Sequence, residues 1–316
     1  MGKPFGHIGA VVLAILVAAP IAPADETVHI APLDITHDKP FVMVTVNGKG
    51  PFRFIIDTGT GAQAFITREL ADQLGLPEVG HVRLSDPSGQ GGQNVPIVVL
   101  QSLRVAGVEF TGVKAAVHNL SSGEGDCQGL LGFRLFRNYL LTLDYLNHRM
   151  ELASGELAPD GAQSVLPFRM PYGIPVVSIT IGATQIDAQI DSGGAGLSLP
   201  LELTSKLKFI SGPEDISNSQ SLFTRFVLKG ATLSSNVHLG SYTFKHPFIE
   251  INPAFPVANF GSCPMQNFSV TFDQKNDLVQ FNSDRHLFRL APTPEPVRLT
   301  NAPATRPPGP NLVPVG

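Results

Sequence analysis

Two aspartates in similar surroundings are the residues of this chain best placed to do chemistry together. Residues 54–60 (FIIDTGT) and 188–194 (AQIDSGG) each contain an apolar strand that ends in Asp-Thr-Gly or Asp-Ser-Gly. The two aspartates, Asp57 and Asp191, are 134 residues apart. Two carboxyl groups held at the ends of buried strands could act as general acid and general base on one water molecule.

The segments that follow the aspartates also repeat. Residues 103–110 (LRVAGVEF) match residues 237–244 (VHLGSYTF), and residues 130–152 pair without a gap with residues 259–281. The identical pairs in the longer match are Gly132 and Gly261, Asn138 and Asn267, Thr142 and Thr271, Asp144 and Asp273, and Asn147 and Asn276. A single Asp-Thr-Gly is a common turn sequence. Two copies at equivalent places of a repeat indicate two related lobes, each of which contributes one carboxylate.

The elements that must position these aspartates read as short strands. Residues 41–46 and 52–56 predict a hairpin around the turn 47–51, and residues 64–66 predict the next strand. Residues 174–181 and 186–190 repeat this plan before Asp191. Short helices are expected at 67–76, closed by Gly75, and at 200–208. We therefore predict an all-β, bilobal fold: two homologous closed β lobes with short helices and a cleft between them.

The ends and the middle of the chain set the expected boundaries. Residues 1–24 read as a signal peptide, with Lys3 before an apolar run at 8–21 and small residues at 22–24. The lobes are expected at 25–152 and 165–290, the polar segment 153–164 as their linker, and the Pro-rich residues 291–316 as a disordered tail. We expect an exported protein, periplasmic or secreted. An uncleaved signal would instead be a membrane anchor.

Composition and motif searches exclude several other functions. The net charge is −4 with 15% charged residues, which does not favour nucleic-acid binding. The nine histidines lack metal-ligand spacing, and no phosphate-binding or dinucleotide-binding loop is present. We therefore expect no metal and no cofactor. Cys127 and Cys263 could form a disulfide in an exported protein or remain separate buried thiols, and the sequence leaves both alternatives open.

The Asp-Thr/Ser-Gly loops have a physical reason. Glycine allows the sharp turn, and a Thr or Ser hydroxyl can hydrogen-bond to the opposite loop. Two carboxyl groups brought together in this way cannot both be ionised cheaply, so they share one proton. Residues 55–59 and 190–193, with the later apolar-apolar-Gly segment at 130–132 and its weaker form at 259–261, resemble the aspartic peptidases of the pepsin and retropepsin fold.

The resemblance is greatest to bacterial exported members with two fused retropepsin-like lobes, and it covers roughly residues 40–281. It implies a single-chain endopeptidase that binds a polypeptide in extended form between the lobes. The residues that it assigns are the catalytic pair Asp57 and Asp191 and the loop-bracing residues Thr58, Gly59, Ser192 and Gly193. A monomer without a stable membrane span after signal cleavage is expected.

Two positions in the second half depart from the family pattern. Gly194 stands where the family has Thr, Ser or Ala and where the first half has Thr60, and Asn259 is polar where the family prefers an apolar residue. Gly194 predicts weaker hydrogen-bond support beside Asp191, and because both positions lie in the second lobe, that lobe could be partly degenerate. Two alternatives therefore stay open: a peptide-binding protein without activity, or a dimer whose catalysis uses only the N-terminal lobes.

Two further segments have a structural and a functional interpretation. Within the Gly-rich loop 85–94, residues 88–93, with Gly89, Gly91 and Gly92, resemble a substrate-covering flap, although a flexible surface hairpin fits equally well. Its counterpart at 215–224 has no glycine. Asp144 and Asp273 each precede an Asn by three residues, which favours hairpin turns over catalysis.

Overall fold

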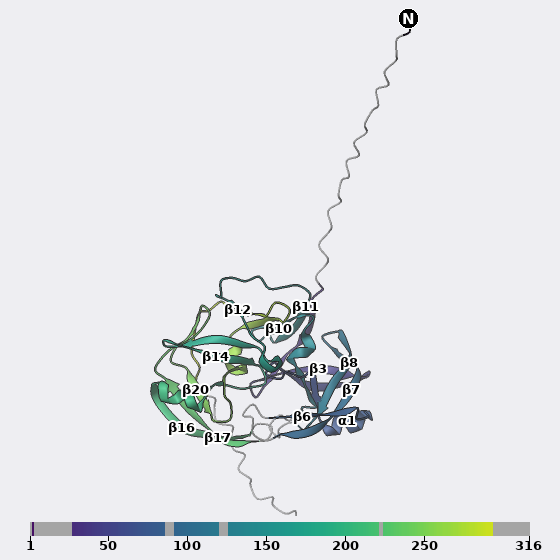
Figure 1. The fold of residues 1–316 in the computed structure, drawn as a ribbon, viewed down its shortest axis with the longest axis horizontal. Helices are drawn as coiled ribbons and strands as arrows, with labels where there is room; N and C mark the ends of the chain where they lie inside the picture. Colours follow the sequence, from purple (N-terminus) through teal and green to yellow (C-terminus); the bar gives the residue numbers. More distant parts are fainter. Residues whose placement is uncertain (1, 3–26, 86–91, 120–125, 221–223, 293–316) are drawn as a thin grey trace, which may run out of the picture.

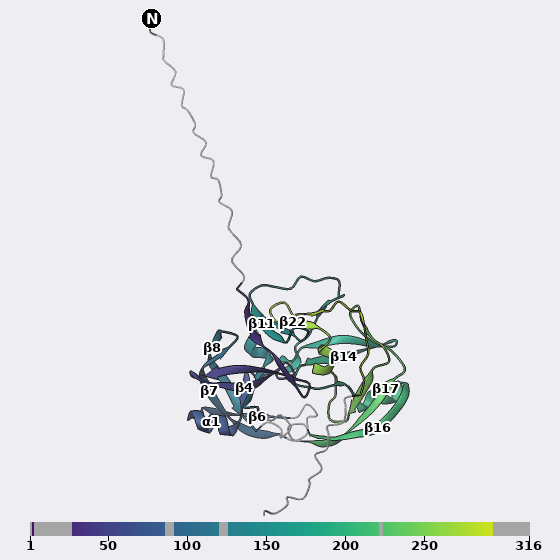
Figure 2. The same ribbon diagram turned by 180° about the vertical axis from the view of Figure 1, so that it is seen from behind.

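The computed structural model describes residues 2, 27–85, 92–119, 126–220 and 224–292, and strands dominate this part of the chain (Figures 1 and 2). The strands form three sheets, and the helices are short. This confirms the all-β fold predicted from the sequence. None of the helices in the described ranges has the length and apolar character needed to cross a membrane. Apart from Gly2, the predicted signal segment lies outside these ranges, as do residues 293–316 of the predicted tail.

The first large sheet is built entirely from the N-terminal half. Its eight described strands, in spatial order, are β2 (Asp34–Thr36), β3 (Lys39–Val46), β4 (Lys49–Asp57), β9 (Gly129–Gly132), β5 (Ala64–Ile66), β8 (Val108–Val117), β7 (Gln93–Val105) and β6 (Gly80–Leu84). An additional pairing of β3 with β7 closes the sheet on itself. The β3–β4 turn is shorter than predicted, because Asn47 and Gly48 both adopt left-handed conformations, with φ of 51° and 74°, and the strand resumes at Lys49.

The helix predicted at 67–76 is α1 (Arg68–Leu74). The Thr67 side chain caps its first turn by accepting from the Leu70 amide, and Gly75 ends it in a left-handed conformation with φ of 64°. Leu70 and Ala71 are buried against the sheet. The remaining helical segments are the 3-10 turns η1 (Phe133–Phe136), η2 (Pro171–Gly173) and η3 (Leu201–Lys206) and the single α-turn α2 (Ser262–Met265).

The second large sheet comes from the C-terminal half. Its ten described strands, in spatial order, are β16 (Phe209–Gln220), β17 (Arg225–Leu233), β20 (Phe248–Asn252), β15 (Leu197–Pro200), β21 (Ala258–Gly261), β14 (Thr184–Asp191), β13 (Val176–Ile181), β18 (Val237–Leu239), β19 (Tyr242–Phe244) and β24 (Leu287–Phe288). The helix predicted at 200–208 is the 3-10 segment η3, and Pro200 belongs to β15. No residue of η3 is buried, so tertiary packing does not favour a full α-helix there.

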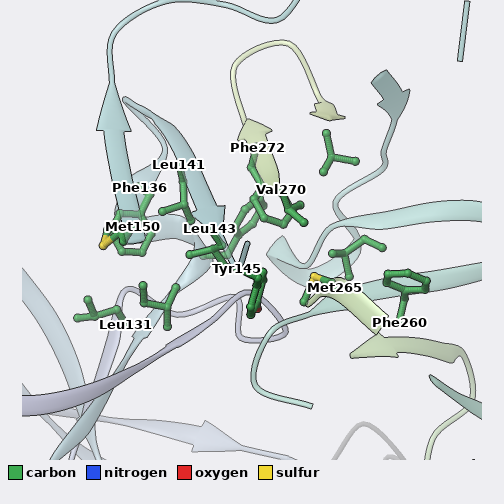
Figure 3. Close-up of a cluster of buried hydrophobic side chains, with 14 of the residues drawn as sticks. Leu131, Phe136, Leu141, Leu143, Tyr145, Met150, Phe260, Met265, Val270 and Phe272 are labelled. Carbon is green, nitrogen blue, oxygen red and sulfur yellow. The ribbon is translucent and has the colours of Figure 1, made fainter. Parts of the chain in front are cut away.

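A third sheet joins the two halves. Its strands, in spatial order, are β1 (His29–Pro32), β11 (Arg149–Ala153), β10 (Leu140–Asp144), β22 (Ser269–Asp273), β23 (Leu278–Asn282) and β12 (Val165–Pro167). At its centre β10 pairs antiparallel with β22, so that Thr142 faces Thr271 and their hydroxyls hydrogen-bond at 2.9 Å. Figure 3 shows apolar side chains of both halves against this sheet, including Phe136 and Leu141 from the first and Phe272 from the second.

The two copies of the repeat make reciprocal contacts across this sheet. Tyr145, in the turn after β10, accepts a hydrogen bond from the Ser262 hydroxyl in the other half. Gln274, at the equivalent turn after β22, donates to the Phe133 carbonyl. No helix or strand lies between β11 and β12, where the linker was predicted. The domain boundaries themselves stay a prediction.

Candidate active site

Each candidate aspartate ends a strand at the same place in its sheet. β4 runs parallel to β9 with Asp57 beside Gly132, and β14 runs parallel to β21 with Asp191 beside Gly261. The glycines are required by close backbone approach: a Cβ at Gly261 would lie 2.6 Å from the Gly196 carbonyl oxygen. The repeated motifs therefore form one structural unit in each half, a strand that ends in Asp held beside a strand that ends in Gly.

The two loops are locked together by their hydroxyl residues. The Thr58 hydroxyl donates to the Ile190 carbonyl at 2.7 Å and accepts from the Ser192 amide at 2.9 Å. The Ser192 hydroxyl donates to the Ile56 carbonyl at 2.6 Å and accepts from the Thr58 amide at 3.0 Å. Both side chains are completely buried. The hydrogen bond across to the opposite loop that the sequence predicted is present in both directions.

The lock brings each carboxyl group against the glycine of the opposite loop. A Cβ built at Gly193 would lie 2.5 Å from the Asp57 carboxyl carbon, and one built at Gly59 would overlap the Asp191 carboxyl group. Any side chain at either glycine would therefore displace an aspartate. Asp191 is buried, whereas Asp57 is partly exposed. Each candidate carboxyl group thus lies against the loop that carries the other.

Hydrogen-bond donors converge on Asp191. Its Oδ1 accepts from the backbone amides of Gly193 and Gly194, both at 2.9 Å. Its Oδ2 accepts from the Asn259 side-chain amide at 2.8 Å and, more weakly, from Gln189 at 3.5 Å. These donors hold the Asp191 carboxyl group in one orientation.

The two residues that depart from the family pattern, Gly194 and Asn259, lie against each other in the structure. Gly194 was expected to weaken the support of Asp191, but Asn259 supplies a hydrogen bond there instead. A Cβ at Gly194 would overlap the Asn259 amide nitrogen and lie 2.8 Å from Asp191 Oδ2. The sequence presented these residues as separate weaknesses because they are far apart in the chain. The one sign of this pair in the sequence is that both residues differ from their first-half counterparts. Glycine replaces the side chain of Thr60, and an amide replaces the apolar side chain of Leu130.

A tyrosine behind the site was not singled out from the sequence. Tyr145 is buried and accepts from the Ser262 hydroxyl at 3.3 Å. Burial raises the pKa of Tyr145 well above its ordinary value, and the nearby charge of Asp191 raises it further. Tyr145 is therefore a neutral group behind Asp191. Its only sequence signal was its place in the repeated turn.

The flap candidate is described only at its base. β6 and β7 pair antiparallel up to Leu84 and Gln93, and Gly92 follows with φ of 141°. Gly89 and Gly91 lie outside the described residues, so the flap stays a prediction. In the second half the counterpart hairpin is formed by β16 and β17.

The two cysteines do not pair with each other. Both are described, and neither forms a disulfide. Cys127 is buried and its thiol donates to the Gly129 carbonyl at 3.1 Å, whereas Cys263 is partly buried. Burial, with smaller contributions from Asp38 and Glu250, raises the pKa of Cys263 to about 11. The chain thus has separate thiols, the second alternative left open by the sequence.

Asp144 and Asp273 are turn residues, as predicted. Each carboxylate accepts from both the backbone and the side-chain amide of the asparagine three residues later, Asn147 or Asn276. Neither carboxylate takes part in the arrangement around Asp57 and Asp191. Their conservation between the two halves reflects one repeated hairpin.

Comparison with known proteins agrees with this geometry for the first half. Residues 42–135 match a family model described as aspartyl protease. The match spans the Asp57 loop and Gly132 and ends before Asp191. A comparison with curated proteins found no match. The match supports the class of aspartic peptidases, and the second half is linked to it through the internal repeat and the equivalent strand pairing.

Proposed function

We propose that this protein is an aspartic endopeptidase in which Asp57 and Asp191 activate a water molecule to hydrolyse a peptide bond. One observation carries the proposal: each of the two carboxyl groups lies against the glycine of the opposite loop. Such proximity makes double ionisation unfavourable, so the pair holds one proton, as is known for aspartic peptidases. The aspartyl protease match over residues 42–135 supports the same class.

The mechanism uses the pair as acid and base together. The ionised carboxylate takes a proton from water while the water oxygen attacks the peptide carbonyl carbon. The protonated carboxyl group gives its proton to the carbonyl oxygen, which produces a tetrahedral diol. Transfer of a proton to the amide nitrogen then breaks the carbon–nitrogen bond and releases the amine and the acid. The locked loops contribute by holding both carboxyl groups in position before substrate binds.

The substrate, the oligomeric state and the export of the protein are proposed from the sequence. The substrate is a polypeptide held in extended form between the halves, and the enzyme works as a monomer after export. No cofactor takes part in the chemistry described above. The dimer alternative is disfavoured because the Asp57 loop already forms its reciprocal hydrogen bonds with the Asp191 loop of the same chain.

Replacement of either aspartate tests the function. Asp57→Asn and Asp191→Asn should each lower kcat/KM for peptide cleavage by at least about 1000-fold, because each removes one of the two proton-transfer groups. The measurement is cleavage of a diverse peptide mixture from acidic to neutral pH, followed by mass spectrometry. Far-ultraviolet circular dichroism checks that each variant is folded.

The same experiment separates the alternatives. Full turnover by Asp191→Asn would show that the second carboxylate is not catalytic and would favour the N-terminal dimer. Peptide binding without cleavage by the wild-type protein, retained in both variants, would favour a binding protein.

A further inference from the structure

The support of Asp191 in this chain comes from a residue outside its own loop. The Asn259 side-chain amide donates to Asp191 Oδ2 at 2.8 Å, although the two residues are 68 positions apart. Asn259 lies on β21, beside Gln189 of β14 and Ser198 of β15. It is only 8% exposed, so water competes little for the amide.

At the two equivalent positions, the first half has a side chain where the second has glycine, and an apolar residue where the second has an amide. Leu130 on β9 pairs with Ile55 and Phe65, as Asn259 pairs with the corresponding strands of the second half. The amides of Thr60 and Gly194 contact the carbonyls of Asp57 and Asp191 in the same manner, at 3.4 and 3.2 Å. At these two equivalent positions the chain therefore has Thr60 and Leu130 in one half and Gly194 and Asn259 in the other.

Gly194 and Asn259 depend on each other sterically. A side chain at residue 194 would overlap the Asn259 amide nitrogen, and its Cβ would lie 2.8 Å from Asp191 Oδ2. Glycine at this position is thus the condition for the amide to reach the carboxylate. Asn259 occupies the space that a residue 194 side chain would need.

The stability of the fold does not explain why residue 259 has an amide side chain. The Asn259 Oδ1 atom is buried and has no hydrogen-bond partner. A buried polar atom without a partner is destabilising, and the leucine at the equivalent place of the first half shows that an apolar side chain fits such a site. The single bond that Asn259 does make is directed at the candidate catalytic carboxylate.

We propose that Asn259 is a positioning residue that holds the Asp191 carboxyl group in its working orientation, and that glycine at position 194 leaves the space that the Asn259 amide needs. The inference rests on the proposed function and deepens it by naming a residue pair outside the motif. Two titratable groups of the described chain that lie near Asp191 are Asp57, against Gly193, and Tyr145. Burial raises the pKa of Tyr145, which leaves the Asp57 carboxyl group as the proposed partner of Asp191.

The test replaces Asn259 and Gly194 by their first-half counterparts, leucine and threonine, first singly and then together. Asn259→Leu alone should lower kcat/KM by about 10- to 100-fold, mostly through kcat, because a hydrogen bond to a charged group is lost. The acid limb of the pH profile should also move to higher pH, because the ionised form loses a donor. Gly194→Thr alone should lose activity through the collision with Asn259. The double variant should recover part of the activity and of the acid limb, because the collision with the Asn259 amide is removed and the threonine hydroxyl can replace that amide after a small shift of Asp191 Oδ2.

A matched control separates positioning from packing. Asn252, on β20 of the same sheet, is also 8% exposed and accepts from the Ala254 amide. Asn252→Leu should reduce stability and leave the acid limb of the pH profile unchanged. Asn259→Leu should retain the wild-type unfolding midpoint, because it removes the unpaired oxygen.

Some outcomes would overturn the proposal. An unchanged acid limb in Asn259→Leu, or a double variant no more active than Asn259→Leu, would contradict it. Carbon-detected NMR titration of the carboxyl pair in the same four proteins provides a readout that does not need turnover. If the wild-type protein were inactive, a shift of that titration by Asn259→Leu with recovery in the double variant would still support the positioning role. A titration that Asn259→Leu does not shift would contradict the positioning role of Asn259.

Discussion

Two hydroxyl groups determine how the halves meet at the level of single residues. Thr58 and Ser192 each donate one hydrogen bond and accept another, and together they satisfy four buried backbone groups of the two loops. Buried polar groups of this kind are costly when unpaired. The interlocked geometry therefore depends on both residue types. Neither loop can shift without breaking bonds in the other.

Thr58→Val tests this lock with almost no change in shape. It leaves the Ile190 carbonyl and the Ser192 amide buried without partners, so the free energy of unfolding should fall by at least about 1–3 kcal/mol. Peptide cleavage should fall as well, because the carboxyl groups lose their fixed positions. Urea unfolding measures the first effect. Thr204→Val in η3, where the hydroxyl bond is exposed, should change stability by less than about 0.5 kcal/mol. Equal effects of the two substitutions would contradict the lock.

At the level of elements, carboxylates outside the site organise the connections. The segment between β11 and β12 ends in a turn around Asp160, whose oxygens accept from the backbone amides of Gln163, Ser164 and Val165 and from the Ser164 hydroxyl. The Ser164 hydroxyl is the largest contribution that lowers the pKa of Asp160 to about 2, and the three backbone amides add to it. The start of β12 is therefore held by a charged group.

The lowered pKa predicts a pH dependence for this connection. Because the folded pKa lies below the ordinary value of 3.8, Asp160 contributes stability above about pH 3.8 and loses it as pH falls towards about 2. Asp160→Asn should be less stable than the wild type at pH 7, and the difference should disappear near pH 2. Unfolding measured at both pH values checks this. A difference that stays constant down to pH 2 would mean that the charge of Asp160 has no role.

At the level of the whole molecule, the shared sheet makes the halves interdependent. β10 and β22 pair across the centre, and behind them Phe133 of the first half contacts Phe272 of the second, with ring centroids 5.2 Å apart. Both rings are completely buried. Separation of the halves would expose two sheet edges and this aromatic contact together. We expect the molecule to unfold as one cooperative unit.

Phe272→Ala tests that cooperativity. It should lower the free energy of unfolding by about 3–5 kcal/mol, as expected for a buried phenylalanine. Each half has one cysteine that forms no disulfide, Cys127 or Cys263, so thiol labelling in urea reports on each half separately. The two labelling midpoints should coincide in the wild type and move together in the variant. Separate midpoints would show that the halves unfold independently.

Much of the local structure was predictable because short-range signals determine it. Helix α1 was predicted to within two residues at each end, since Thr67 and Gly75 cap it within the same segment. The strands that end in Asp57 and Asp191 followed from their apolar runs. The short helix expected at 200–208 is present as the shorter 3-10 segment η3, because no residue of it is buried and sequence periodicity does not report burial.

The same distinction between local and distant interactions explains which features of the candidate site were predictable from the sequence. The sequence was sufficient for the all-β fold, the repeated lobe and the two Asp-Thr/Ser-Gly loops, because an apolar run, a turn residue and a repeat lie within one segment or recur in register. The compensation between Gly194 and Asn259, the tyrosine behind Asp191 and the sheet shared by both halves required the folded chain. Each depends on side chains that are distant in the sequence, and their contacts exist only when both halves pack together.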